Sequence, residues 1–277
     1  MPTSAENRKM FPLVRVSPFP MKIKCLCVMW LVLAGGSLMA ADPASPTAAV
    51  PPANNAVVPV PKLENDVYDW NARHTAVLVA KKDFNPEIVM IGDSITHFWG
   101  GNHPKDKLQR GPNAWKKLFE AWRVLNLGFG WDRTQNVLWR LEHEEFDGLK
   151  PRYVVINIGT NNLTGTANAR ENTPPEIAAG IAAICRKIRD KSPDSRIILM
   201  AVFPRGAAAD NPFRPKITAL NALLATYAKS QQLTFLDLGP KLLQPDGSLS
   251  TEIMDDGTHP TEKGYAIWAE ALRTVLK

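Results

Sequence analysis

Five short apolar runs alternate with amphipathic stretches from about residue 63 onward. The runs are Glu87–Ile91, Val124–Leu127, Tyr153–Ile158, Ile197–Val202 and Leu233–Leu238. Helical periodicity occupies Ala114–Ala121, Thr134–Glu142, Ile177–Asp190, Lys216–Lys229 and Glu262–Leu276. Strands that are apolar at nearly every position are buried on both faces, and helices between them join parallel strands. The pattern therefore predicts an α/β fold, a three-layer α/β/α sandwich with a five-stranded parallel sheet and right-handed crossovers.

The first 41 residues have the pattern of an export signal. A basic stretch at Met21–Lys24 precedes an apolar run at Cys25–Leu33, and small residues follow at Ala34–Ala41. This order is typical of a secretory signal peptide and is too short and wrongly flanked for a stable membrane span. We expect residues 1–41 to be removed and the protein to be exported, periplasmic or secreted, without stable membrane insertion. The alternative is an uncleaved N-terminal anchor. Since the signal begins so clearly at Met21, residues 1–20 are interpreted as a mis-assigned start.

Residues 42–62 are rich in Pro, Ala and Val and carry almost no charge. Pro51, Pro52, Pro59 and Pro61 disfavour both helix and inner strand. We expect an extended tether here, followed by one globular domain at residues 63–277.

Charge and cysteine content exclude some classes of function. The net charge is +6, but residues 1–41 hold five basic residues and one acid, which leaves about +2 for the rest. Because no run of Lys and Arg with interleaved aromatics remains, nucleic acid is not expected as a partner. Two of the three cysteines lie in the predicted signal. The third, Cys185, lies in an apolar helical context and is expected to pack in the core, without an intrachain disulfide.

Polar motifs follow the first three predicted strands and precede the last helix. They are Gly92-Asp93-Ser94, Gly128–Asp132, Gly159–Asn162 and Asp256–His259. Each alone is ordinary turn chemistry. In an open parallel sheet, however, sites gather beyond the carboxyl ends of the strands. Four such motifs at one edge of a sheet predict a hydrolase active site.

The motifs supply a nucleophile, a base and an orienting acid. A serine hydroxyl needs a base to take its proton, and that base needs a third group to orient it. Ser94 lies in a tight turn that would expose its hydroxyl, and His259 is the best candidate base, with His97 as the competitor. Asp256 lies three residues before His259 and is the expected orienting acid, with Asp255 as the alternative.

Ester cleavage also needs hydrogen-bond donors where negative charge develops on the substrate oxygen. Three candidates are the Ser94 main-chain N–H, an N–H from the Gly130-Trp131 turn and the side-chain amide of Asn161. Together they would form an oxyanion hole.

Other site chemistries lack their motifs. The chain has no His-Glu-x-x-His, no close pair of histidines, no Cys cluster, no Gly-x-Ser-x-Gly elbow and no glycine-rich phosphate loop. Neither a metal nor another cofactor is therefore expected. Asp93, Asp132 and Arg133 are expected to stabilise the turns around the site.

With these motifs the sequence resembles the SGNH (GDSL-type) hydrolase superfamily, and within it the branch that is like the catalytic subunits of platelet-activating-factor acetylhydrolase. The resemblance runs from about Glu87 to Lys277. It extends to three further segments, Val137–Leu141, Pro204–Gly206 and Asn211–Arg214. The resemblance implies a flavodoxin-like sheet and no metal. It also implies the following roles: nucleophile Ser94, oxyanion amide Asn161, orienting acid Asp256 and base His259.

Two residues depart from the family pattern. Where the family has a glycine before the Asp of the second motif, this chain has Trp131. Any residue except proline supplies the main-chain N–H, so the set of hydrogen-bond donors is unchanged. The indole instead affects the shape of the site: it either narrows the acyl pocket or points into the core. Many members have Asp after the Asn of the third motif, whereas this chain has Asn162, which removes a charge but keeps the Asn161 amide.

The leading hypothesis is therefore a serine esterase that removes small acyl groups, acetyl above all, from a carbohydrate or other polar alcohol. The expected partner is a small-molecule or glycan ester. One alternative is a lipase or lysophospholipase acting on longer acyl chains, and another is a glycan-binding domain without catalysis. An intact set of nucleophile, base and acid argues against the last.

Overall fold

The computed structural model describes residues 53–101, 104 and 108–277. The predicted signal peptide and the first part of the predicted tether lie outside these residues. The description below concerns the unit Pro51–Lys277, to which all of these residues belong. Within the described ranges, no helix combines the length and apolarity needed to cross a membrane.

Five parallel strands form the sheet, as the apolar runs predicted. They are β1 (Ile88–Gly92), β2 (Val124–Gly128), β3 (Tyr153–Asn157), β4 (Arg196–Met200) and β5 (Thr234–Leu236). Their spatial order is β2-β1-β3-β4-β5, which is the flavodoxin-like order. Gly92 at the end of β1 aligns with Gly128 of β2 and with Asn157 of β3. The first two polar motifs therefore begin at the same level of the sheet, and the third begins two residues beyond that level, at Gly159.

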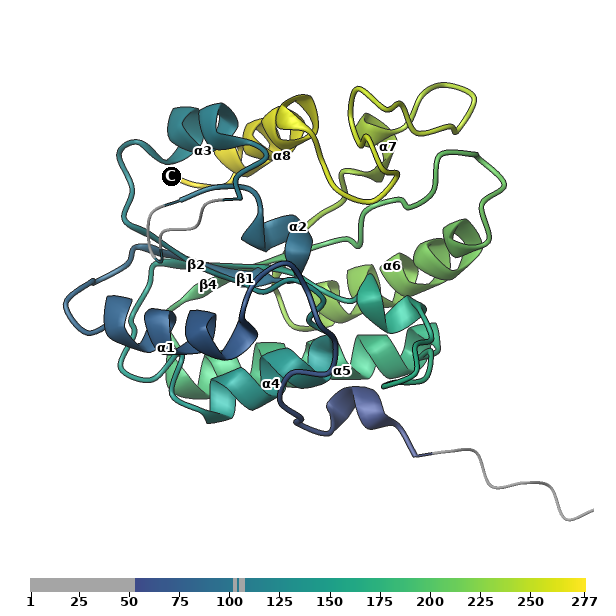
Figure 1. Ribbon diagram of the computed structural model, residues 1–277. Coiled ribbons are helices and arrows are strands. Elements are labelled where there is room, and N and C mark those ends of the chain that lie inside the picture. Colours follow the sequence, from purple (N-terminus) through teal and green to yellow (C-terminus); the bar gives the residue numbers. More distant parts are fainter. Residues whose placement is uncertain (1–52, 102–103, 105–107) are drawn as a thin grey trace, which may run out of the picture. The chain divides into compact units, whose positions relative to one another are not determined.

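Helices cover both faces of the sheet (Figure 1). One layer consists of α1 (Trp70–Ala80), α4 (Thr134–Glu142), α5 (Pro174–Lys191) and α6 (Phe213–Ser230). The other contains α3 (Pro112–Phe119) and α8 (Glu262–Arg273), with the short helices α2 (Ser94–His97) and α7 (Gly239–Leu242) on the same side. Successive residues of β1 face opposite cores: Val89 and Ile91 pack with the first layer, and Ile88 and Met90 with the second. The predicted three-layer architecture is confirmed.

Among the described residues, three α-helices were not predicted from the sequence, and four of the five predicted helices differ at their ends, with α4 as the exception. The unpredicted helices are α1, α2 and α7. Helix α1 buries Arg73 together with Trp70 and Val77, while Val79 is exposed, so apolar periodicity is a poor guide to it. Helices α5 and α6 begin three residues earlier than predicted. Helix α5 begins at a proline behind a capping box formed by Thr173 and Glu176.

The second part of the predicted tether packs against the domain, which corrects that prediction for residues 53–62. A short 3-10 helix, η1 (Asn55–Val57), buries Ala56, whose carbonyl accepts a hydrogen bond from the Thr134 hydroxyl at 2.8 Å. Farther along, the Asn136 amide donates to the carbonyl of Pro61 at 2.6 Å. Proline prevents regular structure here, but main-chain carbonyls still accept from side chains of α4. The folded part of the chain thus includes residues 53–62.

The remaining cysteine packs in the core, as expected. Cys185 lies on α5 with 1% of its surface exposed. Burial raises the pKa of its thiol to about 12. The thiol is therefore protonated and uncharged at physiological pH, and the side chain packs in the core.

Candidate active site

The candidate nucleophile follows β1 by one residue. The strand ends at Gly92, and Ser94 begins α2 with 7% of its surface exposed. A side chain at Gly92 would lie 2.1 Å from the Thr96 hydroxyl and 2.4 Å from the Asn157 carbonyl, so only glycine fits this turn. From α8, the Tyr265 hydroxyl donates to the Ile95 carbonyl at 2.8 Å and holds α2 in place.

His259 and Asp256 meet Ser94 at the carboxyl edge of the sheet. His259 Nε2 lies 2.8 Å from Ser94 Oγ, and His259 Nδ1 lies 2.6 Å from Asp256 Oδ2. A carboxylate only accepts hydrogen bonds, so Nδ1 carries the ring proton and Nε2 accepts from the serine hydroxyl. The structure thus brings the three predicted residues into one hydrogen-bonded chain.

The Asp256 carboxylate is held by its own loop. Its Oδ1 accepts from the main-chain N–H of Thr258 at 2.9 Å and of His259 at 2.7 Å. Burial opposes its ionisation, but these bonds and the His259 ring outweigh burial and lower the pKa of Asp256 to about 2. The alternative acid, Asp255, is turned away and pairs with Arg110. Asp256, and not Asp255, is therefore the carboxylate in contact with the His259 imidazole.

The competing base, His97, has another partner. The main-chain N–H of Gly130 donates to His97 Nδ1 at 3.2 Å. The ring is buried, with 2% of its surface exposed, and packs edge-on against Tyr68 at 4.6 Å between ring centroids. The geometry favours His259 over His97 as the base for Ser94. Because the Gly130 N–H is engaged, the donor left in the Gly130-Trp131 turn is the N–H of Trp131.

The loop after β2 and the Asn161 side chain adjoin each other. Asn161 Nδ2 donates to the main-chain carbonyl of Asp132 at 3.0 Å, which uses one of the two N–H groups of the amide. The loop is tied to the Gly92 turn, since the Phe129 N–H donates to the Gly92 carbonyl at 3.0 Å. Asn161 is 6% exposed. The candidate oxyanion donors thus lie on two loops that are hydrogen-bonded to each other or to the nucleophile turn.

Trp131 does not belong to the core. Its side chain is half-buried, unlike its fully buried neighbours Gly130 and Asp132. Its backbone has a φ of 62°, in the left-handed region that favours glycine. Such a conformation costs about 1–2 kcal/mol in a residue with a β-carbon, so the surrounding loop must hold it.

Asn162, the second departure from the family pattern, is structural. It is fully buried and accepts from the Thr134 N–H at 3.0 Å, and its amide donates to Gln135 and Asn172, each at 2.9 Å. These contacts fix the start of α4 beside the site. An aspartate here could not make the two donated bonds.

Buried carboxyls flank the candidate triad. Asp93 is fully buried and caps α2 by accepting from the Ile95 N–H at 2.9 Å. Burial raises the pKa of Asp93 to about 7 although this bond opposes the shift, and Asp132 raises it further. The Arg205 guanidinium lies near Asp93 and Asp256 and donates a hydrogen bond to the Thr164 hydroxyl at 2.7 Å. Burial disfavours its charged form too and lowers its pKa. As expected, Asp93 stabilises the turn of the nucleophile.

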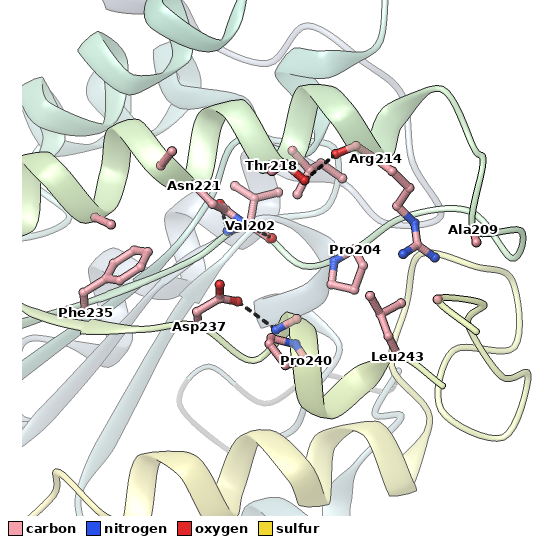
Figure 2. A pocket seen from close by; sticks show the side chains of 15 residues that line it. Val202, Pro204, Ala209, Arg214, Thr218, Asn221, Phe235, Asp237, Pro240 and Leu243 are labelled. Atoms are coloured by element: carbon pink, nitrogen blue, oxygen red, sulfur yellow. Dashed lines mark hydrogen bonds between the residues drawn. The ribbon is translucent and has the colours of Figure 1, made fainter. Parts of the chain in front are cut away.

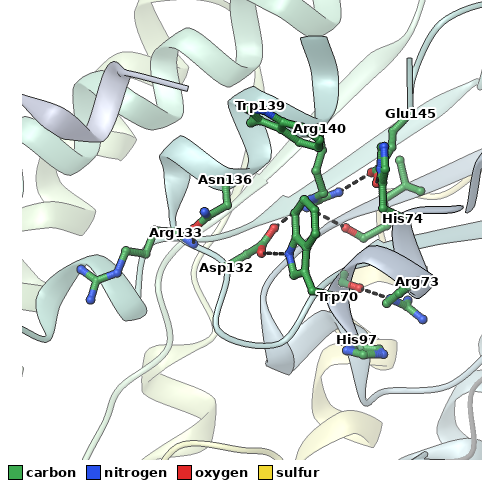
Figure 3. Close-up of polar contacts among 12 residues, drawn as sticks. Trp70, Arg73, His74, His97, Asp132, Arg133, Asn136, Trp139, Arg140 and Glu145 are labelled. Carbon is green, nitrogen blue, oxygen red and sulfur yellow. Dashed lines mark hydrogen bonds and ion pairs between the residues drawn. The ribbon is translucent and has the colours of Figure 1, made fainter. Parts of the chain in front are cut away.

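Sequence reasoning missed a buried polar network behind the second motif. Asp132 contacts Trp70 and Arg140, and Arg140 contacts Glu145 (Figure 3). A signal was present: Arg140 lies three residues after Val137 on the inward side of α4, where a charge requires a partner. Arg133, by contrast, is the N-cap residue before α4 and donates to the carbonyl of Thr164 at 2.8 Å, as its turn-stabilising prediction implies.

A cavity of about 510 Å³ lies between α6, α7 and the end of β5 (Figure 2). Apolar side chains supply much of its wall, among them Val202, Pro204, Ile217, Phe235 and Leu243. Neither Ser94, His259 nor Asp256 lines it. The cavity is therefore a separate feature from the hydrogen-bonded chain at the sheet edge.

A flavodoxin-like parallel sheet with Ser, His and Asp side chains hydrogen-bonded at its carboxyl edge defines a hydrolase of the SGNH type. The sequence pattern of the GDSL-like Lipase/Acylhydrolase family matches residues 90–267, and the chain belongs to this family. The family supports a hydrolase activity of the esterase or acylhydrolase kind.

Named relatives and solved structures agree with this family. The chain is 34% identical over 208 residues to platelet-activating factor acetylhydrolase IB subunit alpha1 of Homo sapiens, covering 75% of this chain and 82% of that protein. It is equally similar to subunit alpha2 of Rattus norvegicus, with 75% and 83% covered. Among structures, an acetylxylan esterase from Geobacillus stearothermophilus superimposes with a TM-score of 0.55 at 21% identity, covering 69% of this chain and 94% of that one. A putative acylhydrolase from Bacteroides fragilis gives a TM-score of 0.58 at 23% identity, with 75% and 97% covered.

Proposed function

We propose that this protein hydrolyses acetyl or similarly short acyl esters of a carbohydrate or other polar alcohol. Ser94 is the nucleophile, His259 the base and Asp256 the acid that orients it. The Ser94 and Trp131 main-chain N–H groups and the Asn161 amide form the oxyanion hole. The single observation that carries the proposal is the continuous contact from Ser94 Oγ to His259 Nε2, 2.8 Å, and from His259 Nδ1 to Asp256, 2.6 Å.

The reaction proceeds in two steps. Ser94 Oγ attacks the ester carbonyl while His259 Nε2 takes its proton, and the carbonyl oxygen becomes an oxyanion held by the three donors. The imidazolium then protonates the leaving alcohol, and an acyl group remains on Ser94. A water molecule, deprotonated by His259, attacks this acyl-enzyme. The bond to Ser94 Oγ then breaks, His259 returns the proton to Ser94 Oγ, and the carboxylic acid leaves. Asp256 holds the ring in the required tautomer and stabilises its charge in both steps.

Two observations support a short acyl group and a polar carrier. The relatives are named acetylhydrolases and one structural neighbour is named an acetylxylan esterase. The predicted export signal favours an extracellular carrier, and polysaccharide and glycan esters lie outside the cell. A periplasmic or secreted location is thus part of the proposal. Cell fractionation with N-terminal sequencing of the mature protein tests it, and an unprocessed cytoplasmic protein would contradict it.

The alternative of a lipase acting on long acyl chains is favoured by one observation, the largely apolar cavity of about 510 Å³. An acyl chain that reached it would have to pass from Ser94 toward α6. The residues that line the cavity do not include the candidate triad, so we favour the short-acyl function.

Chain-length profiling on p-nitrophenyl esters separates these functions. We expect acetate to be turned over faster than octanoate, and the reverse would overturn the short-acyl proposal. Ala225 lines the cavity, and an Ala225→Phe variant places a phenyl ring in it and narrows it. If the cavity holds long acyl chains, this variant loses octanoate hydrolysis selectively; for a short-acyl esterase the ratio is unchanged.

Release of acetate from an acetylated xylooligosaccharide tests the carrier. We expect Ser94→Ala to abolish this release. Hydrolysis unaffected by Ser94→Ala would contradict the role of this serine. Glycan binding without any release of acetate by the natural chain would instead indicate a glycan-binding domain without catalysis.

A further inference from the structure

The side chain of Asp132 is fixed on both of its oxygens. Oδ1 accepts from the indole N–H of Trp70 at 2.7 Å, and Oδ2 accepts from Arg140 Nε at 2.8 Å. Asp132 and Arg140 are 2% and 1% exposed. A carboxylate held in this way by two buried donors has one position and one orientation.

Arg140 is itself held from several directions (Figure 3). Its Nη1 pairs with Glu145 at 2.5 Å, and its Nη2 donates to the Leu127 carbonyl of β2 at 3.3 Å. The guanidinium lies over the Phe129 ring, 4.0 Å from its centroid. Although burial opposes the charge, the two carboxylates outweigh it and raise the pKa of Arg140. The network therefore ties the loop after β2 to α1 and α4.

The main chain of Asp132 connects this network to the candidate oxyanion donors. Its carbonyl accepts from Asn161 Nδ2 at 3.0 Å, and its N–H donates to the Phe129 carbonyl at 3.1 Å. The preceding residue is Trp131, whose left-handed backbone, with φ 62°, requires support from its neighbours. Asp132 thus adjoins both the Asn161 amide and the Trp131 N–H.

We propose that Asp132, locked by Arg140 and Trp70, is a positioning residue for the oxyanion hole: its carbonyl orients the Asn161 amide, and its fixed side chain keeps the Trp131 N–H in its turn. The inference rests on the proposed function of these donors. Preorganised donors stabilise the transition state because they need no rearrangement as charge develops. A displacement of a few tenths of an ångström weakens that effect without removing the donors.

Asp132→Asn is the first test, because it keeps the shape of the side chain but places an amide N–H₂ against Arg140 or Trp70. We expect kcat on p-nitrophenyl acetate to fall roughly 10- to 100-fold, less than the 10²–10³-fold typical of a deleted oxyanion donor. KM should change less than about twofold, since the donors act on the transition state. The acid limb of the pH profile should be unchanged, since the His259–Asp256 pair is untouched.

A double-mutant cycle with Asn161→Ala distinguishes positioning from a purely structural role. If Asp132 acts through Asn161, Asp132→Asn should cost less than about threefold in the Asn161→Ala background. Equal losses in both backgrounds would overturn the inference. Glu142→Gln is the control: it breaks an ion pair with Lys187 at the end of α4 that is distant from Asp132, and it should show no coupling to Asn161.

Trp70→Phe keeps the inference testable if Asp132→Asn does not fold. It removes the indole N–H donated to Asp132 and part of the buried ring but keeps an aromatic side chain in the core, so a smaller loss of kcat with the same coupling to Asn161 is expected. Ser94→Ala separates this inference from the proposed function. If Ser94 proves dispensable, the proposed function fails; if hydrolysis depends on Ser94 but the cycle is additive, only the positioning role fails.

Discussion

His259 and Asp256 are 24% and 49% exposed in their side chains, whereas Asp132 and Arg140, on the opposite side of the candidate site, are 2% and 1% exposed. The acid–base half, His259 with Asp256, is held by hydrogen bonds that span two or three residues of one loop. The oxyanion half, Asp132 with its partners, depends on contacts such as that with Trp70, 62 residues away. The proposed base is thus oriented by contacts within its own loop, whereas the proposed oxyanion donors adjoin a buried framework built from distant parts of the chain.

The largest expected effect lies in the acid–base half. Ser94→Ala and His259→Ala should each lower kcat by about 10⁴-fold or more, and the double variant should be little worse than either, because the two residues act as a unit. The free energy of unfolding should change by less than about 1 kcal/mol, since few contacts are lost. Kinetics on p-nitrophenyl acetate and urea unfolding measure the two quantities. Multiplying effects in the double variant would contradict a joint role.

The next largest effect is expected at Asp256, and it tests whether the orienting role belongs to this residue alone. Asp256→Asn should lower kcat by about 10³- to 10⁴-fold, because an amide cannot select the ring tautomer that leaves Nε2 free to accept. The matched control is the adjacent Asp255→Asn, which breaks only a contact with Arg110 and should alter kcat less than about twofold. Comparable losses in both variants would show that the orienting role is not confined to Asp256.

Asp93, a buried carboxyl next to the proposed nucleophile, should make the free energy of unfolding depend on pH. With its pKa raised to about 7, the folded protein keeps the proton that the unfolded chain loses near pH 4. The free energy of unfolding should therefore fall as pH rises from about 4 to about 7, by up to about 4 kcal/mol from this group, and stay constant above.

Asp93→Asn removes that titration while keeping a side-chain acceptor for the Ile95 N–H. The variant should gain stability relative to the natural chain at pH 8 compared with pH 5. Asp132, whose pKa burial raises to about 6, contributes a similar fall in both proteins, so it cancels in the difference. Urea unfolding at the two pH values measures it, and an equal difference at both would show that Asp93 ionises freely in the folded state.

The smallest effect concerns Trp131. Trp131→Gly relieves the left-handed backbone but adds freedom to the unfolded chain, so stability should change by less than about 1 kcal/mol. Acetate hydrolysis should stay within about threefold, since glycine supplies the same N–H, while butyrate should gain relative to acetate. Trp131→Ala is the control, because it removes the indole but keeps the strained β-carbon. A hundredfold loss in both variants would mean that the indole itself contributes to catalysis.

Most of the fold could be predicted from apolar runs because parallel strands buried on both faces leave an unambiguous pattern. Helix α1 could not, since its buried face includes Arg73, whose Nε donates to the Gly128 carbonyl at 2.8 Å. A buried cation looks like a solvated one in a sequence. Residues 53–62 were misjudged for a related reason: prolines exclude regular structure, but they do not exclude packing.

In the candidate site, too, some residues could be predicted from the sequence and others could not. Ser94, Asp256 and His259 could be predicted because turn motifs and a three-residue spacing are local features of sequence, and the structure brings them together. The partners of Asp132 could not be predicted, because no sequence feature near residue 132 indicates a contact with Trp70. Trp131 was left open between core and pocket, and its half-buried side chain and positive φ became visible only in three dimensions.

The bond from Tyr265 to the Ile95 carbonyl has a consequence for the order of folding. It spans 170 residues, and the contact between His259 and Ser94 spans 165. Closing loops of this length is entropically costly and slow. During refolding, ester hydrolysis should return only when the last helix docks, later than the bulk of the helical signal. A chain cut before residue 256 would carry its serine without a base.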